Sequence, residues 1–412
     1  MKTLLPAAWH EELVQTRWDL HSHPELRYEE FRTSDLVTQA LMQYGYSVVR
    51  GLGGTGVVAT LPGEDPSRGI VLRADMDALP LTEANGVAHA SLTPGKMHAC
   101  GHDGHTVMLL GAARLLKSLP RLPGSVHFVF QPAEEGGAGA RRMIEEGLFE
   151  RFPTEAVFGM HNWPGLPEGV FGLREGPIMA AGVRFHLVVR GQGAHAAQPH
   201  LARDPIPVLS ALVLQMQTIV SRQISPSEPA VVSVCMLSAG ETDNVIPDAA
   251  EMRGTIRSLT SEVLEDIQQR LRQLCAGAAS SHGVEVDVVF HQYYPATVNT
   301  PEHTGLCTEV VQKSFGSAAL RYPVPSNMTS EDFGFMLQQR PGAYVLLGNQ
   351  GQQGHTAPLH NPSYDFNDAI IPKGVEFWVN LARSYYARPA SEWRGVSAAP
   401  GQLRTGKAWQ QD

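Results

Sequence analysis

Four short segments of the sequence concentrate side chains that bind metal ions and transfer protons. They are 97–103 (MHACGHD), 131–137 (QPAEEGG), 159–162 (GMHN) and 359–362 (LHNP). Cysteine thiolate, imidazole and carboxylate are together the usual ligand set of Zn²⁺ and related divalent ions. If the four segments converge, their side chains can hold such ions and activate a water molecule.

Cys100 and His102 stand two residues apart in a turn that contains glycine, so both side chains can face one point. Three further ligands would come from Glu135, His161 and His360. Together they offer enough donor atoms for two ions that share one bridging ligand. Only one of two adjacent glutamates needs to bind metal. The other, Glu134, can take a proton from a water whose pKa the ions lower towards ~7.

Each of these features has a plainer explanation when it stands alone. A single histidine among seventeen is more often a surface or capping residue than a ligand, and adjacent glutamates usually lie on a solvated face. A Glu-Glu pair that follows an apolar stretch and is flanked by proline and two glycines is harder to explain as surface. The coincidence of four such segments therefore favours a metal centre.

The elements expected around these segments are strands that alternate with helices. Apolar stretches predict strands at 70–72, 126–130, 156–160 and 343–347, and helical periodicity predicts helices at 8–44, 105–119 and 372–386. This alternation is typical of a largely parallel α/β sheet. Ligand sites in such sheets gather outside the carboxyl ends of the strands, which is where Glu134 and His161 are expected.

The middle of the chain has a different order of elements. Strands are predicted at 183–190, 230–237, 249–258 and 284–290, and helices at 205–222 and 261–281. The resulting β-α-β-β-α-β order is the split unit of a ferredoxin-like domain. Because α/β signals resume afterwards, we expect a catalytic domain of residues 1–181 and 298–412, interrupted by an inserted domain at 182–297.

The composition of the chain limits which classes of protein it can belong to. The chain has 412 residues and a net charge of −9, which argues against nucleic acid as a partner because phosphate binding needs a basic surface. No stretch of about 18 apolar residues predicts a membrane span, and residues 1–15 lack the apolar region of a secretory signal. The Pro-, Gly- and Ser-rich stretch after Arg388 is expected to be disordered. The scattered cysteines suit a reducing, cytoplasmic location; they are Cys100, Cys235, Cys275 and Cys307.

The motifs resemble those of the amidohydrolase branch of the M20 metallopeptidases, which includes hippurate hydrolases, N-acyl amino acid amidohydrolases and plant auxin-conjugate hydrolases. The matching stretches are 20–26, 73–80, 98–103, 131–137, 244–248 and 360–362. The resemblance extends from about residue 18 to 386. It implies a phosphorylase/hydrolase-like α/β catalytic domain with an inserted ferredoxin-like α+β lid domain that closes over substrate and mediates dimerisation.

The resemblance also implies roles for single residues. Cys100 would bridge two divalent ions, Zn or Mn, with Co or Ni also compatible. One ion would be held by His102 and His161, and the other by Glu135 and His360. Glu134 would be the general base, and later the acid that protonates the leaving amine. Because every one of these positions carries the expected residue type, a non-catalytic relative is disfavoured.

Three residues of the inserted domain are expected to contact substrate. By the same resemblance, His195 would stabilise the developing oxyanion, in its own or a neighbouring subunit's site. Asn244 and Arg257 resemble positions that hold the substrate's free carboxylate.

Asp75 and Asp77 follow an expected strand and could orient a ligand histidine. The pair at His21 and His23 is interpreted as structural, because it follows a helix and no (β/α)₈ pattern follows.

The sequence thus predicts a hydrolase that cuts the amide bond of an N-acyl amino acid, with an aromatic or short acyl group, and releases the amino acid and a carboxylic acid. A homodimer or higher oligomer through the lid domain is expected. Three alternatives stay open: a dipeptidase, an aromatic-amine deaminase on the same scaffold, and a metal-binding regulator without turnover.

Overall fold

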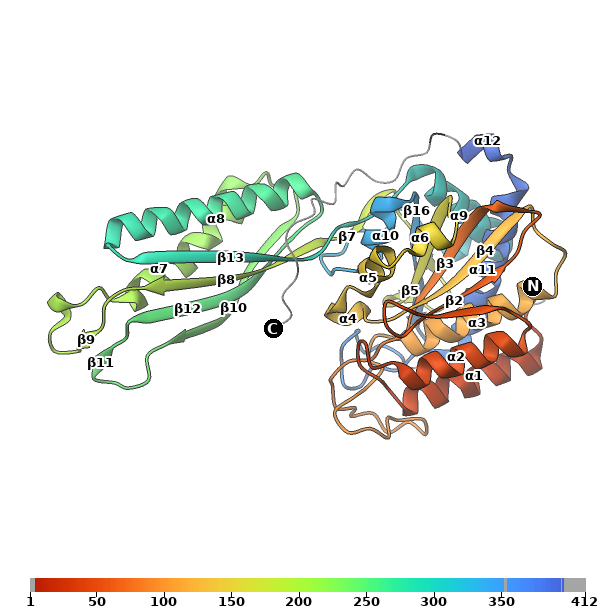
Figure 1. The fold of residues 1–412 in the computed structure, drawn as a ribbon, viewed down its shortest axis with the longest axis horizontal. Helices are drawn as coiled ribbons and strands as arrows, with labels where there is room; N and C mark the ends of the chain where they lie inside the picture. Colours follow the sequence, from red (N-terminus) through yellow and green to blue (C-terminus); the bar gives the residue numbers. More distant parts are fainter. Residues whose placement is uncertain (1–3, 352–353, 394, 396–412) are drawn as a thin grey trace. The chain divides into compact units, whose positions relative to one another are not determined.

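The computed structural model describes residues 4–351, 354–393 and 395, and the chain forms two compact units (Figure 1). Unit 1 comprises Met1–Gly176, Val298–Pro325 and Asp332–Asp412, and unit 2 comprises Pro177–Thr297 and Ser326–Glu331. The chain therefore leaves unit 1 at Pro177 to build most of unit 2, returns at Val298, and adds the short segment Ser326–Glu331 to unit 2 before it returns again. Most of the stretch after Arg388 lies outside the described residues.

Unit 1 is built on an eight-stranded sheet in the order β1-β2-β4-β3-β5-β16-β6-β15. The strands are β1 (Val48–Leu52), β2 (Gly56–Leu61), β3 (Asp65–Asp75), β4 (Gly124–Gln131), β5 (Ala156–Pro167), β6 (Phe171–Gly172), β15 (Leu320–Arg321) and β16 (Gly342–Gln350). The central strands β4, β3, β5 and β16 run parallel, β1 and β2 pair antiparallel with their neighbours, and β6 pairs antiparallel with β16 and parallel with β15. The expected α/β class is confirmed, with a sheet that is mixed at its edges.

Helices bury this sheet. Its longer helices are α1 (Ala7–Ser22), α2 (Phe31–Gln43), α3 (His102–Lys117), α9 (Pro301–Phe315) and α11 (Ile371–Ala387). Shorter ones are α4 (Glu134–Gly137), α5 (Gly139–Glu145), α6 (Leu148–Arg151), α10 (Gly334–Gln339) and α12 (Ala390–Trp393). Every residue of β4 is buried, so both faces of the sheet are covered at its centre. Among the described residues, none of the helices is long and apolar enough to cross a membrane.

Close packing around α3 depends on glycine. A Cβ added at Gly111 would lie 2.7 Å from side-chain atoms of both Leu13 and Val375, so α3 approaches α1 and α11 closely at this point. Almost all residues of α3 are buried. The helix that begins at His102 is therefore fixed from several sides, which gives the preceding loop a rigid support.

The single helix expected at 8–44 is wrong, because the chain forms two helices separated by a connection at 23–30. Pro24 lacks a backbone N–H and disfavours helical geometry at the residue before it. His23 accordingly adopts φ −126° and ψ 58°.

A second expectation, that a strand ends just before His161, also needs correction. β5 does not end at Met160, since its pairing with β16 continues to Pro167, and His161 lies inside the strand.

Unit 2 has an antiparallel sheet in the order β10-β12-β8-β13. Its elements follow the chain as β8 (Ala181–Arg190), α7 (Pro205–Thr218), β10 (Ala230–Ala239), β12 (Ala249–Ser258), α8 (Ser261–His282) and β13 (Glu285–Tyr294). Alternate residues of β8 are buried against the two helices, as in a sheet with one covered face. Shorter strands are β7 (Gly176–Met179), β9 (Ala194–His195), β11 (Val245–Ile246) and β14 (Thr297–Asn299).

The buried His127 on β4 predicts a loss of stability in acid. Burial lowers its pKa to about 4, although its Nε2–H donates to the carbonyl of Pro153 at 3.0 Å. An unfolded chain protonates its histidines near pH 6.5, so proton uptake favours unfolding as pH falls from about 6.5 to 4. We expect this residue to cost up to about 3 kcal/mol of stability over that range.

The measurement is urea unfolding, followed by circular dichroism between pH 4 and 7 with a chelator present. His127→Gln should flatten the acid side of the stability profile, and His200→Gln, which changes an exposed residue, serves as the control. A profile that His127→Gln leaves unchanged would exclude this residue as the source.

Candidate metal centre

Three of the five predicted ligands converge in unit 1. Ligand atoms of Cys100, His102 and Glu135 all lie within 4.8 Å of one another. Cys100 belongs to the loop before α3, His102 is the first residue of α3, and Glu135 lies in the turn after β4. Cys100 and His102 are neighbours in the sequence, but Glu135 is separated from them by α3 and β4, so the fold brings it to the cluster.

The other two predicted ligands extend this cluster on opposite sides. The Nε2 atom of His161 lies 3.4 Å from Sγ of Cys100. The Nε2 atom of His360 lies 3.1 Å from Oε1 of Glu135. The side chain of His360 is 54% exposed, whereas His161 is buried. All five predicted ligands therefore form one continuous group.

Unusual backbone conformations bring the ligands to these places. Gly101 has φ 89°, and a Cβ at this position would lie 2.2 Å from Nδ2 of Asn162, so only glycine fits the turn. Ala133, just before the two glutamates, has φ 54°, and His360 has φ 62°. The backbone N–H of His360 donates to the carbonyl of Ala99 at 2.8 Å, which ties the two ligand loops together.

The carboxylate of Asp77 connects two of these segments. It accepts hydrogen bonds from the backbone N–H groups of Glu134 at 3.0 Å and Glu135 at 2.8 Å. It also lies 3.2 Å from Nδ1 of His102. An Nδ1–H bond to this carboxylate leaves Nε2 of His102 as the lone-pair nitrogen directed at the cluster. The expectation that Asp77 orients a ligand histidine agrees with this geometry.

A second polar network, which the sequence reasoning missed, lies behind Cys100 and His161. The side-chain amide of Asn162 donates to the backbone carbonyl of Cys100 at 2.6 Å, and the backbone carbonyl of Asn162 accepts from Nδ1 of His161 at 2.6 Å. Nδ1 of His105 donates to Asp75 at 2.6 Å. Asp75 thus has its short hydrogen bond with His105, while its other carboxylate oxygen lies 3.7 Å from Nε2 of the predicted ligand His102. His105 and Asn162 flank ligand histidines in the sequence, which is the signal that could have identified them.

Electrostatics within the cluster favour a bound cation. Burial, together with the charges of Glu135 and Glu134, raises the pKa of the Cys100 thiol well above its usual range. Burial and His105 lower the pKa of His161, which is therefore a neutral donor. Burial alone would lower the pKa of His102, but Asp75 and Asp77 outweigh it and raise the pKa to about 10. A group that gathers a thiol and several carboxylates needs added positive charge.

Two buried atoms that have no hydrogen-bond partner provide the test of fit. They are Nε2 of His102 and Oε1 of Glu135. The ring of His360 lies 3.1 Å from this Glu135 oxygen but does not form a hydrogen bond with it. Buried polar atoms are normally satisfied, and an unsatisfied pair facing one cluster is what a divalent cation would satisfy. The residues present therefore fit a metal site.

Glu134 lies next to this cluster without belonging to the group of three. It is buried, and one oxygen lies 3.4 Å from the backbone N–H of Asp332, which donates to it. His21, excluded as a ligand from the sequence, is held by two carboxylates, Asp103 at 2.9 Å and Glu83 at 3.2 Å. This environment agrees with a structural role for His21.

The three predicted substrate-binding residues of unit 2 are not brought together. His195 on β9 pairs with Val245 on β11, and the N–H of Ala196 donates to the carbonyl of Asn244, so His195 and Asn244 are neighbours. Arg257 pairs with Gly182, at the other end of β8 from this hairpin. It is half-buried, and burial lowers its pKa.

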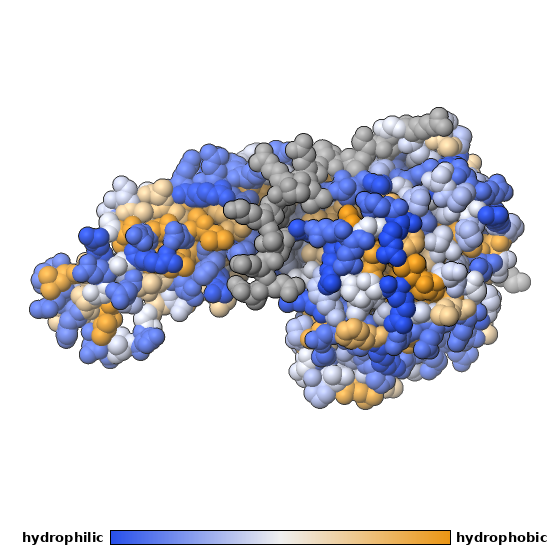
Figure 2. All heavy atoms as spheres, viewed as in Figure 1, coloured by the Kyte–Doolittle hydropathy of each residue, from blue (hydrophilic) through white to orange (hydrophobic). Residues whose placement is uncertain are grey.

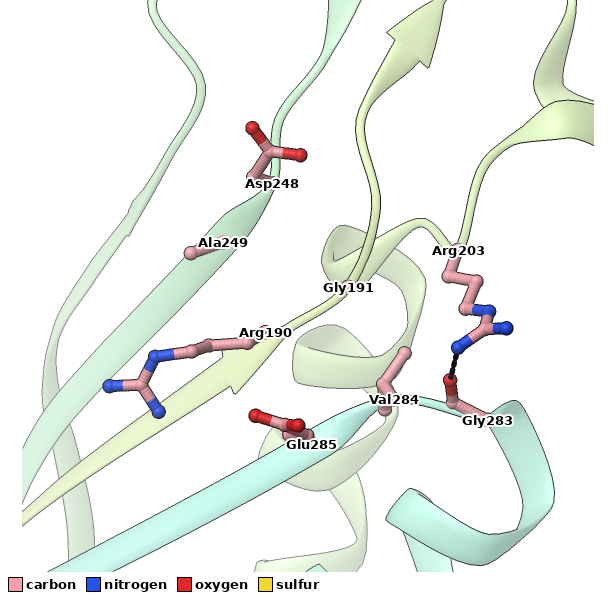
Figure 3. A pocket seen from close by; sticks show the side chains of 8 residues that line it. All are labelled: Arg190, Gly191, Arg203, Asp248, Ala249, Gly283, Val284 and Glu285. Atoms are coloured by element: carbon pink, nitrogen blue, oxygen red, sulfur yellow. Dashed lines mark hydrogen bonds between the residues drawn. The ribbon is translucent and has the colours of Figure 1, made fainter.

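None of the predicted site residues lines the cavity of about 410 Å³ in unit 2 (Figure 3). Its polar groups are engaged with the protein itself. Arg203 donates to the carbonyl of Gly283 at 3.2 Å, and Asp248 accepts from the N–H of Gly193 at 2.7 Å. These bonds support the base of the hairpin that carries His195. A larger cavity of about 1080 Å³ in unit 1 lies among α1, α2 and α3 and also contains no predicted ligand.

Comparisons with known proteins agree with this geometry. The model of peptidase family M20/M25/M40 matches residues 71–384. The chain is 38% identical to the hippurate hydrolase of Campylobacter jejuni, over 91% of this chain and 96% of that protein. It is also 38% identical to an N-acetyl-L-cysteine deacetylase of Bacillus subtilis, over 90% and 88% respectively. Among solved structures, this chain is similar to the Bacillus subtilis YXEP protein, which is described as a dinuclear metal binding peptidase from the M20 family. The two structures superpose with a TM-score of 0.81 at 32% identity, over 93% of this chain and 99% of that one. The resemblance of the motifs is confirmed.

Replacing the acceptor at position 77 should weaken metal binding. Asp77→Asn keeps the size of the side chain but puts an amide donor against backbone N–H groups. We expect metal affinity to fall by about 10- to 100-fold, the usual effect of removing a partner that orients a ligand. The measurement is titration with Zn²⁺ or Mn²⁺ against a competing chelator.

Asp204→Asn is the matched control, because Asp204 also accepts a backbone N–H, from Ile206 at 2.9 Å, at the start of α7 in unit 2. Asparagine caps a helix as well as aspartate does, so this variant should bind metal normally. Equal affinity in both variants would contradict the role given to Asp77.

Proposed function

Because the chain belongs to peptidase family M20/M25/M40, we propose that it hydrolyses the amide bond of N-acyl amino acids and releases the free amino acid and a carboxylic acid. It is a metal-dependent amide hydrolase, as its relatives are named hydrolases and deacetylases. The observation that carries the proposal is the convergence of Cys100, His102 and Glu135, extended by His161 and His360.

We propose that these five residues hold two divalent ions. The sulfur of Cys100 lies 3.4 Å from Nε2 of His161 and within 4.8 Å of ligand atoms of His102 and Glu135, so it would be suited to be the shared ligand. His102 and His161 would complete one site, and Glu135 and His360 the other. When bound, such ions polarise an amide carbonyl and make water acidic enough to lose a proton near neutral pH. The description of the YXEP protein as dinuclear supports the number of ions, and Zn, Mn, Co or Ni are all compatible with this donor set.

Glu134 is the proposed general base. It is buried beside the ligand Glu135, and its backbone is fixed by Asp77. Its carboxylate would accept a proton from the attacking water while the water oxygen bonds to the amide carbon. The same carboxyl group would then give that proton to the amide nitrogen as the C–N bond breaks. One glutamate therefore serves as base and acid, as a hydrolysis without net proton change requires.

Several observations support an aromatic acyl group. A hippurate hydrolase is among the relatives, and hippurate is N-benzoylglycine. Trp163 follows His161 by two residues on β5, so both side chains lie on one face of the strand, with ring centres 6.3 Å apart. The residue paired with Trp163 on β16 is Gly348, which has no side chain to cover the indole. Trp163 thus offers a half-buried aromatic surface beside a proposed ligand.

The placement of the unit 2 residues supports a site completed by two chains. Arg257 pairs with Gly182 and Ala249 pairs with Arg190, and the hairpin of His195 and Asn244 lies beyond Arg190. The eight residue steps from Gly182 to Arg190 span roughly 26 Å. A small substrate cannot contact Arg257 and His195 of the same chain across that length. We therefore propose that His195 and Asn244 serve a neighbouring subunit's site, where His195 stabilises the oxyanion.

One edge of unit 2 has the properties of an interface between two copies. β10 is an edge strand whose Met236 and Leu237 are 62% and 55% exposed. Leu214 on the neighbouring helix α7 is 72% exposed. Figure 2 shows apolar residues at the surface of this unit among charged ones. An open strand edge with apolar side chains tends to pair with another chain, so we propose that the dimer forms here.

The alternatives differ in their products. A dipeptidase would release two amino acids, a deaminase ammonia, and a metal-binding regulator nothing. The presence of Glu134 beside a complete ligand set favours turnover, since metal binding alone does not need a second glutamate. The four cysteines are unpaired, which suits the proposed cytoplasmic location.

Replacing the proposed base should separate metal binding from catalysis. Glu134→Ala should retain about two metal ions per chain and lose hydrolysis almost completely, because the five ligands remain. The measurement combines metal analysis with mass spectrometry of products from N-benzoylglycine, N-acetyl amino acids, indole-acetyl amino acids and dipeptides, with and without a chelator. Glu145→Ala, which changes an exposed residue, is the control.

Chelator-sensitive release of an amino acid and a carboxylic acid by the unchanged protein is the expected result, with benzoyl or indole-acetyl groups preferred. Full activity of Glu134→Ala would refute the assignment of the base. Release of ammonia or of two amino acids would favour one of the alternatives.

The proposed dimer can be tested by complementation. We expect Glu134→Ala and His195→Ala each to be inactive as pure proteins. Mixed dimers should regain part of the activity, because one of their two sites has Glu134 from one chain and His195 from the other. The measurement is hydrolysis after the two variants are mixed, unfolded together and refolded.

Met236→Glu with Leu237→Glu should shift the protein to monomers in light scattering, while Val289→Glu changes an exposed apolar residue on the opposite edge strand and should not. A monomer in the unchanged protein, or no complementation in a confirmed mixed dimer, would refute a shared site.

A further inference from the structure

The connection between α1 and α2 contacts the turn that carries the two proposed catalytic glutamates. Three of its residues form hydrogen bonds with backbone groups of that turn. Arg27 Nη1 donates to the carbonyl of Glu135 at 3.1 Å, and the hydroxyl of Tyr28 donates to the carbonyl of Gly137 at 2.6 Å. Glu30 accepts from the N–H of Ala133 at 2.8 Å. Alternate residues of the turn, 133, 135 and 137, are therefore each held by this connection.

The turn needs such support because its backbone is irregular. Ala133 and Ala138 both have positive φ, 54° and 56°, which is unfavourable for a residue with a side chain. Between them Glu135 has ψ 70° and Gly136 has φ 83°, so no regular helix forms. Conformations of this kind persist only where the surrounding structure fixes them.

A fully buried glutamate such as Glu30 is unusual at a position that has only a structural role. It is 0% exposed, and no salt bridge of Glu30 is present among the described residues. Its two oxygens are occupied by the N–H of Ala133 and by the hydroxyl of Thr55. It also precedes the first turn of α2, where the positive end of the helix dipole stabilises a negative charge. Burial, and the charge of Asp77, raise its pKa to about 7.

The turn is thus held from two sides. Asp77 accepts the N–H groups of Glu134 and Glu135, and the connection takes the N–H of Ala133 and the carbonyls of Glu135 and Gly137. Two adjacent carboxylates repel each other, and they can have different roles only if the backbone between them keeps their side chains apart.

We propose that Tyr28 and Glu30 are positioning residues, which fix the 133–137 turn so that Glu135 binds metal while Glu134 stays available as the base. This inference rests on the proposed function for the roles of the two glutamates. It assigns a role to the connection at 23–30, which interrupts the helix expected at 8–44. The connection acts through the backbone of the turn and touches neither substrate nor metal.

Tyr28→Phe is the sharpest test, since it removes one hydroxyl and keeps the ring. Tyr46→Phe is its matched control, because the Tyr46 hydroxyl also donates to a backbone carbonyl, that of Ala113 at 2.8 Å, in the buried core of unit 1. We expect kcat of Tyr28→Phe to fall about 10-fold with little change in KM, as misplacement of a catalytic group predicts. Tyr46→Phe should lose stability in urea without a change in kcat.

Two readouts do not depend on the substrate. The first is the visible spectrum of the Co²⁺-loaded protein, in which thiolate and ligand-field bands report the geometry at Cys100 and Glu135. The second is the affinity for Co²⁺ itself. Both should change in Tyr28→Phe and stay as in the unchanged protein in Tyr46→Phe. If the protein hydrolyses no N-acyl amino acid, the proposed function fails while these two measurements still test the positioning role.

Glu30 supplies a graded series. Glu30→Gln keeps an oxygen that can accept from Ala133, and Glu30→Ala does not, so kcat and Co²⁺ affinity should decrease in the order Glu, Gln, Ala. If Glu30→Ala does not fold, Tyr28→Phe and Glu30→Gln still decide the question. Loss of stability alone in both variants, with kcat, Co²⁺ affinity and the spectrum unchanged, would overturn the proposal.

Discussion

The carboxylate of Asp77, at the end of β3, is the constraint on which the site depends. It accepts three hydrogen bonds, from two adjacent backbone N–H groups and from the ring of His102. A carboxylate with several donors is a strong and directional anchor. Because the N–H groups belong to Glu134 and Glu135, their positions are set relative to His102 by one group. The end of a central parallel strand thereby determines the arrangement of both the proposed metal ligands and the proposed base.

The same region gathers much negative charge, and the protein provides few cations to balance it. Arg73 is fully buried and donates to Asp75 at 2.7 Å and to Asp332 at 3.0 Å. His102 balances part of the rest, as its raised pKa indicates. The thiol of Cys100, with its pKa raised by burial and by two glutamates, has no such partner. A divalent ion bound here would supply the missing charge and favour the thiolate over the thiol, so the buried negative charge of the fold would itself promote metal binding.

The sequence was sufficient for the α/β class, for most strands and helices, and for a set of ligands that the structure brings together. Apolar strands and long helices are local patterns, and ligand types are visible in the motifs. What it did not predict depends on contacts between distant segments. The interruption at Pro24, the continuation of β5 through His161, and the bonds of His105 and Asn162 all follow from neighbours that only the fold provides. Short strands such as β1 were missed because five residues carry too little pattern.

The proposed ligands also differ in how firmly they are held and in how exposed they are. His102 and His161 are buried, and each has its second ring nitrogen engaged, with Asp77 and with the carbonyl of Asn162. His360 is more than half exposed at 54%, and its backbone is anchored to the Cys100 loop through Ala99. Its ring can therefore move more freely than the other two. Among the five side chains, His360 is the most exposed to solvent, whereas the side chain of Glu135 beside it is only 12% exposed. The buried histidines have a fixed geometry, and the exposed His360 leaves the proposed metal centre open on one side, as a centre that must exchange water for substrate requires.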